Sequence, residues 1–217
     1  ASTQGAVVLS QEAEDLGADG LLVVVPYYNR PNQRGLLAHF QKVASATCLP
    51  IYLYNVPKRT GAYLEPETIL ELAYTPSIQG LKDASGSLSD LQMILEKIRA
   101  DRPDFSLLCG DDLLTFPFLA LGGDGIVSVV SNLLPKEMVR LTDCSLQGDW
   151  NHGRELHYQL LPLFRALGVD TNPIPIKAAM EICHMAAGPC RLPLTSLVPQ
   201  QIQDLQHKLI QYTHAFS

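Results

Sequence analysis

The stretch Ile78–Ser85, with the sequence IQGLKDAS, places one lysine at the end of a short apolar run and directly before a small-residue turn. An apolar run bounded by turn residues is typical of a buried strand, so Lys82 is expected to end that strand. Partial removal from water lowers the pKa of a lysine and frees its amine to attack a carbonyl. The stretch predicts a Schiff-base lysine; the alternative is a lysine that extends from a strand end into water.

The same order of strand, polar loop and helix recurs on both sides of this stretch. The expected strands are Leu21–Val25, Ile51–Asn55, Ile78–Lys82, Phe105–Cys109 and Gly125–Val129. The expected helices that alternate with them cover about residues 2–17, 33–46, 65–74 and 88–100, with a further one ending at Leu121. The strand ends at positions 28, 54, 82 and 110 are 26 to 28 residues apart. This regular spacing corresponds to one βα unit.

Strands that alternate with helices predict an α/β fold with a parallel sheet, and polar residues after the strand ends are typical of a TIM (β/α)8 barrel. We expect residues 1–134 to form the five C-terminal strands of such a barrel. Residues 135–217 are expected to supply its last helix and a helical extension, with helices at about 135–146, 149–167, 173–187 and 199–213. A doubly wound sheet is less favoured, because no glycine-rich fingerprint follows the first strand.

The composition restricts the class of partner. The chain of 217 residues has a formal net charge of -6, which provides no basic surface for nucleic acid and favours a small-molecule partner. No apolar run is long enough to span a bilayer and no signal-peptide pattern stands at the start, so a cytoplasmic location is expected. The five scattered cysteines and six histidines lack ligand spacing, so neither a metal site nor a cofactor is expected.

Polar residues stand where the expected strands end: Tyr28, Tyr54 with Arg59, Lys82, and Gly110–Asp112. In a barrel these positions converge on one cavity. An amine there would attack a keto group, a phenol would move protons, and a guanidinium would hold a carboxylate. Each residue also has a structural interpretation, as a sheet-edge aromatic, a surface charge or a helix start.

Six motifs run along the whole chain in a fixed order. They are Val25–Pro31 (VPYYNRP), Tyr54–Gly61 (YNVPKRTG), Gly80–Ala84 (GLKDA), Gly110–Asp112 (GDD), Gly125–Val129 (GIVSV) and Asn172–Lys177 (NPIPIK). In this order and at nearly this spacing, the chain resembles the dihydrodipicolinate synthase and N-acetylneuraminate lyase family. The first two motifs are the most specific.

The resemblance implies class I aldolase chemistry on a barrel, with pyruvate bound as a Schiff base on Lys82. By the same match, Tyr54 is the proton donor and acceptor, and Tyr28 is a relay tyrosine given to a neighbouring subunit of a homodimer or homotetramer. Arg59 would anchor the carboxylate of the second substrate. The backbone at Val127 would line the pyruvate pocket, with Gly110 close by.

The arginine of YNVPKRTG favours the synthase branch of the family, which condenses pyruvate with L-aspartate semialdehyde to give 4-hydroxy-tetrahydrodipicolinate in lysine and diaminopimelate synthesis. Two alternatives stay open. One is another pyruvate-dependent aldolase of the family, acting on N-acetylneuraminate or a 2-keto-3-deoxy sugar acid. The other is a non-catalytic truncated fragment.

The chain departs from the family pattern at its start. Residue 1 corresponds to a point after the third barrel strand, so three βα units and a Thr-Thr turn that binds the pyruvate carboxylate have no counterpart in this sequence. We expect these 217 residues alone to be insoluble or molten, because the first strand would have an open edge. Lysine-inhibited relatives carry Asn and Glu at the positions of Ala1 and Gly5, with Tyr27 matching a third site residue, so weak lysine inhibition is expected.

Overall fold

The computed structural model describes residues 1–212, which form two compact units. The first unit consists of residues 1–110 and 121–125, and the second of residues 111–120 and those from 126 onward. Each unit has its own secondary structure and is described separately. The predicted division after residue 134 stays a prediction.

The first unit contains the parallel sheet that the alternating pattern predicted. Its strands are β1 (Leu21–Val24), β2 (Ile51–Asn55), β3 (Ile78–Asp83) and β4 (Ser106–Cys109), and β5 (Gly125–Ile126) adds the last strand at the unit boundary. The strands follow one another in the order β1-β2-β3-β4-β5, and the pairs from β1 to β4 are parallel. Their carboxyl ends therefore lie at one edge of the sheet.

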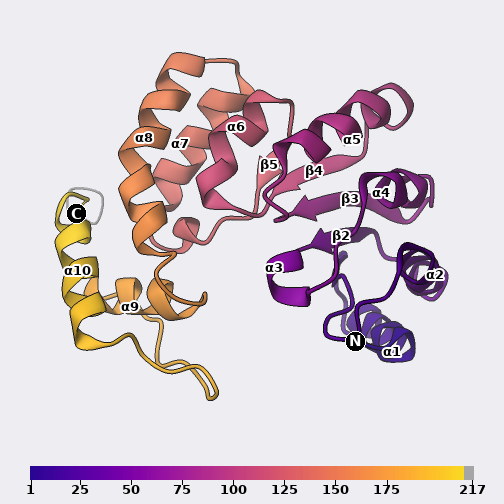
Figure 1. The fold of residues 1–217 in the computed structure, drawn as a ribbon, viewed down its shortest axis with the longest axis horizontal. Helices are drawn as coiled ribbons and strands as arrows, with labels where there is room; N and C mark the ends of the chain where they lie inside the picture. The colour runs from indigo at the N-terminus through magenta and orange to yellow at the C-terminus, as the bar shows by residue number, and fades with distance from the viewer. Residues whose placement is uncertain (213–217) are drawn as a thin grey trace. The chain divides into compact units, whose positions relative to one another are not determined.

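Four helices of the first unit lie along one face of this sheet (Figure 1). They are α1 (Thr3–Asp15), α2 (Gln33–Ala44), α4 (Pro66–Ala73) and α5 (Leu88–Asp101). The N-cap of α1 is Ser2, with its hydroxyl accepting from the N–H of Gly5 at 3.1 Å. Along β2, Ile51 and Leu53 are fully buried, whereas Tyr52 and Tyr54 between them are half-buried on the other face. One face of the strand thus belongs to the core, which also contains Asn55, and the other face carries Tyr52 and Tyr54.

Gly80 allows β3 to pair closely with its neighbours. A Cβ atom at this position would lie 2.4 Å from the ring of Tyr52 and 2.6 Å from the carbonyl oxygen of Ser106. Any side chain at this position would therefore push β3 away from β2 or β4. The glycine allows the three strands to pair closely two residues before Lys82.

The second unit is helical. Its elements are η1 (Asp112–Leu114), α6 (Thr115–Ala120), η2 (Val130–Asn132), α7 (Pro135–Leu146), α8 (Trp150–Ala166), α9 (Ile174–Ile182) and α10 (Pro199–Ile210). Leu141, Leu163, Ala179 and Leu205 contribute to a shared core from α7 to α10. The four helices predicted after residue 135 are present as α7 to α10. The predicted end of the last helix, at residue 213, lies outside the described residues.

Four predicted elements differ from the structure. The expected strand Gly125–Val129 is wrong beyond Ile126, because the carboxylate of Asp112 accepts the N–H groups of Val129 and Val130, each at 3.0 Å, and turns the chain into η2. The expected loop after β2 contains a one-turn helix, α3 (Pro57–Thr60).

The other two differences concern helix ends. The helix expected up to Leu121 is divided into η1 and α6, with Asp111 capping η1. The helix expected over residues 173–187 ends at Ile182, and His184 adopts a left-handed backbone with φ 57°. A non-glycine residue in that conformation does not continue a helix.

Candidate active site

Tyr54 and Lys82 face each other at the carboxyl ends of β2 and β3. They are register partners in the parallel pair, so their side chains leave the sheet on the same face. The Nζ atom of Lys82 lies 4.1 Å from the centroid of the Tyr54 ring, within the range of a cation–π contact. Both side chains are half-buried. The predicted meeting of an amine and a phenol is therefore present.

The phenol of Tyr54 is held in its neutral form. Burial raises the pKa of Tyr54 above its ordinary value of 10.0, and the positive charge of Arg59 opposes that shift in part. Tyr54 therefore carries a proton at neutral pH. Such a phenol can donate that proton to a developing oxyanion and recover one later.

Arg59 is exposed on α3, directly after the strand that carries Tyr54. The helix is short but well fixed: the N–H groups of Arg59 and Thr60 both donate to the carbonyl of Val56, at 2.9 and 3.1 Å. The buried hydroxyl of Thr60 donates to the carbonyl of Ala62 at 2.8 Å. Gly61 ends the turn with φ 71°. The guanidinium thus stands on a rigid turn near Tyr54.

Gly110 lies against the lysine side chain. Its N–H donates to the carbonyl of Asp83 at 2.7 Å. A Cβ atom on Gly110 would lie 3.1 Å from Cε of Lys82 and 3.0 Å from Cβ of Ala84. The absence of a side chain lets the loop after β4 approach Lys82 closely.

Tyr28 belongs to the first unit and has an unusual backbone conformation. Its side chain is 92% exposed, and its φ is 75°, in the left-handed region. The N–H of Tyr28 donates to the carbonyl of Thr60 at 3.1 Å, and Arg30 two residues later also has a positive φ, of 47°. Non-glycine residues rarely adopt such angles, and those that do are concentrated at functional sites.

Val127 follows β5 and belongs to the second unit, where its side chain is 39% exposed. The backbone just after it is fixed by Asp112 through the bonds to Val129 and Val130. Burial raises the pKa of the Asp112 carboxyl, and the bonds that it accepts oppose the shift. The predicted pocket-lining role of Val127 stays a prediction.

A partly buried polar network behind Tyr54 and Lys82 was missed at the level of sequence. Asn55 donates from Nδ2 to Oδ1 of Asp83 at 3.2 Å, and Ser85 donates its hydroxyl proton to Oδ2 of Asp83 at 2.7 Å. The signal was available: Asn55 follows Tyr54 and Asp83 follows Lys82, so the two pairs share one spacing of 28 residues.

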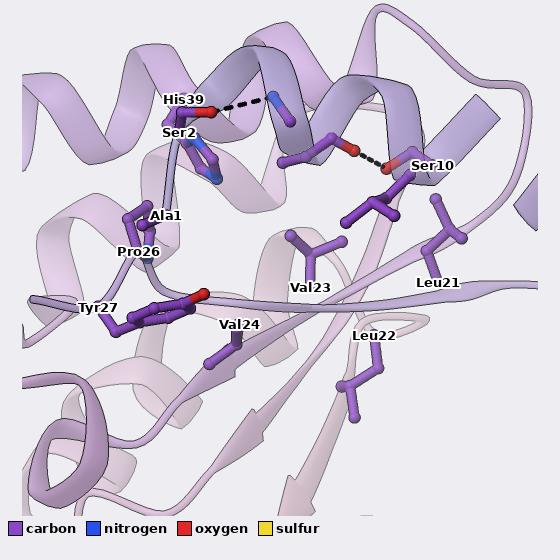
Figure 2. A pocket seen from close by; sticks show the side chains of 13 residues that line it. Ala1, Ser2, Ser10, Leu21, Leu22, Val23, Val24, Pro26, Tyr27 and His39 are labelled. Carbon is purple, nitrogen blue, oxygen red and sulfur yellow. Dashed lines mark hydrogen bonds between the residues drawn. The ribbon is translucent and has the colours of Figure 1, made fainter. Parts of the chain in front are cut away.

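A separate cavity of about 330 Å³ lies between α1 and β1. Figure 2 shows Leu21 and Val23 pointing toward α1, with Tyr27 and His39 at one end. Burial lowers the pKa of His39, and its Nδ1 lies 3.0 Å from the hydroxyl of Thr3. None of the described residues that line this cavity carries a carboxylate.

Two kinds of feature are absent from residues 1–212. No helix in this range is long and apolar enough to cross a membrane. Within the same range, no three or more His, Cys, Asp or Glu side chains are grouped so that they could hold a metal ion.

Comparison with known proteins gave consistent matches. Residues 1–212 match the model of the dihydrodipicolinate synthetase family. A 4-hydroxy-tetrahydrodipicolinate synthase of Methanoculleus marisnigri is 46% identical over 211 residues, covering 97% of this chain and 72% of that protein.

Solved structures agree with this match. The crystal structure of dihydrodipicolinate synthase from Thermotoga maritima superposes with a TM-score of 0.94 at 39% identity, covering 98% of this chain and 72% of the other. That of DHDPS from Cyanidioschyzon merolae with lysine bound has a TM-score of 0.93 at 42% identity, covering 98% and 71%. The parallel sheet and these neighbours together indicate a TIM-barrel-like α/β fold.

Proposed function

Because the chain belongs to the dihydrodipicolinate synthetase family, as its six motifs predicted, we propose that it condenses pyruvate with L-aspartate semialdehyde. It is a Schiff-base-forming lyase, and its product is 4-hydroxy-tetrahydrodipicolinate, for lysine and diaminopimelate synthesis. The observation that carries the proposal is the placement of the Lys82 amine 4.1 Å from the Tyr54 ring centroid.

The proposed reaction begins on the amine of Lys82. The unprotonated nitrogen attacks the keto carbon of pyruvate, and the keto oxygen leaves as water with the two protons of the amine, so an imine forms. A proton then moves from the methyl carbon to the imine nitrogen, which gives the enamine. The enamine carbon bonds to the aldehyde carbon of the second substrate, whose oxygen takes up a proton. The amino group of that substrate then bonds to the former keto carbon and displaces the amine of Lys82, so the ring closes and the lysine is free again.

Tyr54 moves the protons in this scheme. Its phenol is neutral at neutral pH, and burial raises its pKa further above 10.0, so it first donates to the departing oxygen and then accepts a proton as phenolate. Tyr28 acts as the relay tyrosine in the site of a neighbouring copy. Its 92% exposure and positive φ support this role, since they leave the ring available to another chain.

Three further residues bind the substrates. Arg59 anchors the carboxylate of aspartate semialdehyde, because a guanidinium binds a carboxylate with two parallel hydrogen bonds. Gly110 and the backbone at Val127 line the pyruvate pocket. No cofactor or metal enters the scheme.

We further propose that the active form is a cytoplasmic homo-oligomer, a dimer or a tetramer, in which β1 to β5 are the C-terminal strands of a (β/α)8 barrel. Residues 135–217 would supply the last barrel helix and a helical extension. Sedimentation of the complete protein tests the assembly: a monomer that turns over at the full rate would exclude the shared tyrosine.

Borohydride trapping tests the function. The complete protein is incubated with pyruvate and borohydride and then digested. The mass of the peptide that contains Lys82 is measured by mass spectrometry. A reduced pyruvate adduct on Lys82, together with faster turnover of aspartate semialdehyde than of N-acetylneuraminate, is the expected result. Absence of an adduct would overturn the proposed chemistry, and preference for the sugar acid would overturn the proposed substrate.

A further inference from the structure

The buried Asn55 and the partly buried Asp83 form a pair one register position beyond Tyr54 and Lys82. Since successive side chains of a strand point to opposite faces, the pair lies on the face opposite to the phenol and the amine. Asn55 is only 1% exposed. Its amide donates to Oδ1 of Asp83 at 3.2 Å. A polar pair in this position costs desolvation, so its hydrogen bonds must be complete.

The amide of Asn55 is fixed by the chain beyond α3. Nδ2 of Asn55 donates to the carbonyl of Leu64 at 3.2 Å, and Oδ1 accepts the N–H of Leu64 at 3.1 Å. This reciprocal pair of bonds orients the amide, so its remaining N–H points at Asp83. The end of β2 is thereby tied to the segment before α4.

The carboxylate of Asp83 is fixed by the turn after β3. Oδ2 accepts the hydroxyl proton of Ser85 at 2.7 Å, and Oδ1 accepts the N–H of Ser85 at 3.3 Å. The backbone adds two links: the N–H of Ala84 donates to the carbonyl of Asn55 at 2.8 Å, and that of Gly110 to the carbonyl of Asp83 at 2.7 Å. The ends of β2, β3 and β4 are joined at one point.

The charge of Asp83 makes this network sensitive to change. Burial raises the pKa of its carboxyl, and the nearby Asp90 raises it further, whereas the bonds from Ser85 and Asn55 lower it. Asp90 in turn accepts the hydroxyl proton of Tyr63. Removing a donor from Asp83 would leave a partly buried carboxylate short of hydrogen-bond partners, and we expect the strand end to move to restore them.

We propose that Asn55 and Asp83 are positioning residues that hold Tyr54 and Lys82 in reacting geometry. The inference rests on the proposed function. Both residues act through the backbone of β2 and β3, because their side chains lie on the opposite face. A displacement of reacting groups by about 1 Å can lower a rate by roughly a hundredfold.

Three variants of the complete protein test the pair. Asn55→Asp places a second carboxylate next to that of Asp83. Asp83→Asn removes the negative charge of Asp83, and the double variant N55D/D83N exchanges the amide and the carboxylate. The rate constant for trapping pyruvate on Lys82 is measured at a temperature where circular dichroism shows each variant folded, together with kcat and KM for pyruvate.

We expect Asn55→Asp to lower the trapping rate and kcat by roughly a hundredfold, with little change in KM for pyruvate. Asp83→Asn should lower them by about tenfold, since one oxygen still accepts from Asn55. The double variant should trap faster than Asn55→Asp alone, because an amide again faces a carboxylate. Asp90→Asn is the control: it disturbs the same polar layer away from the strand ends and should lower stability while leaving the trapping rate unchanged.

The outcomes separate the two proposals. If the wild-type protein traps no pyruvate, the proposed function fails and the inference fails with it. If the wild type traps pyruvate and the folded variants trap at the wild-type rate, only the inference is overturned. Should Asn55→Asp not fold, Asp83→Asn and the double variant decide. A loss of rate in Asp90→Asn equal to that in Asp83→Asn would also overturn the inference, because it would indicate a merely structural role.

Discussion

Lys82 differs from the other lysines by its place at a strand end opposite a phenol. Lys82→Arg should abolish trapping of pyruvate, because a guanidinium stays protonated and is not nucleophilic. Mass spectrometry of the borohydride-treated protein measures this. The matched control is Lys177→Arg, since the amine of Lys177 donates to the carbonyl of Ala187 in the second unit. A trapped adduct on a lysine other than Lys82 would contradict the assignment.

Arg59 stands on α3, next to a second exposed cation. Arg59→Ala should reduce the use of aspartate semialdehyde by roughly tenfold to a hundredfold, since a hydrogen bond to a charged partner contributes about 1.5–3 kcal/mol. Trapping of pyruvate should change far less. Lys58→Ala removes a charge one residue away and should leave both steps near the wild-type rate. Equal loss in both steps for Arg59→Ala would exclude the anchoring role.

At the scale of elements, α1 and β1 enclose the cavity shown in Figure 2. Ala1, Gly5 and Tyr27 line it, and none of the described residues around it supplies a carboxylate. An ammonium group entering the cavity would lose water without gaining a charge partner. Free lysine should therefore inhibit the complete protein weakly or not at all.

Steady-state assays with added lysine check this expectation, and half-inhibition at micromolar lysine would contradict it. Gly5→Glu is the matched variant, because it adds the missing carboxylate. A Cβ at Gly5 would lie 3.1 Å from the side-chain oxygen of Ser2, so the N-cap hydroxyl must shift slightly to accept the substitution. It should increase sensitivity to lysine.

His157 on α8 makes the second unit sensitive to acid. It is 8% exposed among Phe116, Tyr158 and Phe164, and its Nδ1 has no partner within the described part of the chain. Burial lowers the pKa of His157 below 6.5. The unfolded chain therefore takes up a proton before the folded one does. Stability should be constant above pH 6.5 and should fall below it, by at most about 1.4 kcal/mol per pH unit.

Urea unfolding one pH unit above and one below 6.5 measures this effect. His157→Phe should remove the part of the difference in unfolding free energy that His157 contributes, because a phenyl ring takes no proton, and the part from His39, whose pKa burial also lowers, should remain. His207→Gln, on the exposed side of α10, should leave the difference in unfolding free energy between the two pH values unchanged. An unchanged pH dependence in His157→Phe would assign the acid sensitivity to other groups.

At the scale of the molecule, β1 pairs with β2 along one edge and has no second strand partner among the described residues. Leu22 in this strand is 52% exposed. At roughly 25 cal/mol per Å², several hundred Å² of exposed apolar surface would cost on the order of 10 kcal/mol, which is comparable to the stability of a domain. The 217 residues produced alone should be insoluble or molten and inactive.

Calorimetry and light scattering of the purified 217-residue chain check this expectation. Leu22→Lys should reduce association, because a lysine on an edge strand opposes pairing with another chain. A soluble monomer with a sharp thermal transition would refute the structural expectation. Appreciable turnover of pyruvate with aspartate semialdehyde would show that these residues suffice for catalysis.

The sequence by itself determined the alternation of strands and helices and the residues at the strand ends. Apolar periodicity and turn residues are local properties, so β2, β3 and β4 lie near their predicted bounds. The 28-residue spacing of Tyr54 and Lys82 reflects one βα unit, and such units set parallel strands side by side. For this reason the spacing, together with the predicted barrel, indicated that an amine and a phenol reach one cavity.

Only the tertiary structure decided which groups bond across distant segments. The end of β5 depends on Asp112, which is 17 and 18 residues from the N–H groups that it accepts, and no local pattern encodes that pairing. The contact between Asn55 and Asp83 requires β2 and β3 in their observed register, since a shift by one residue would turn one side chain to the other face. Hydrogen bonds between remote segments form only when packing has fixed the distance between them, and sequence periodicity predicts which strands are neighbours but not which polar atoms bond.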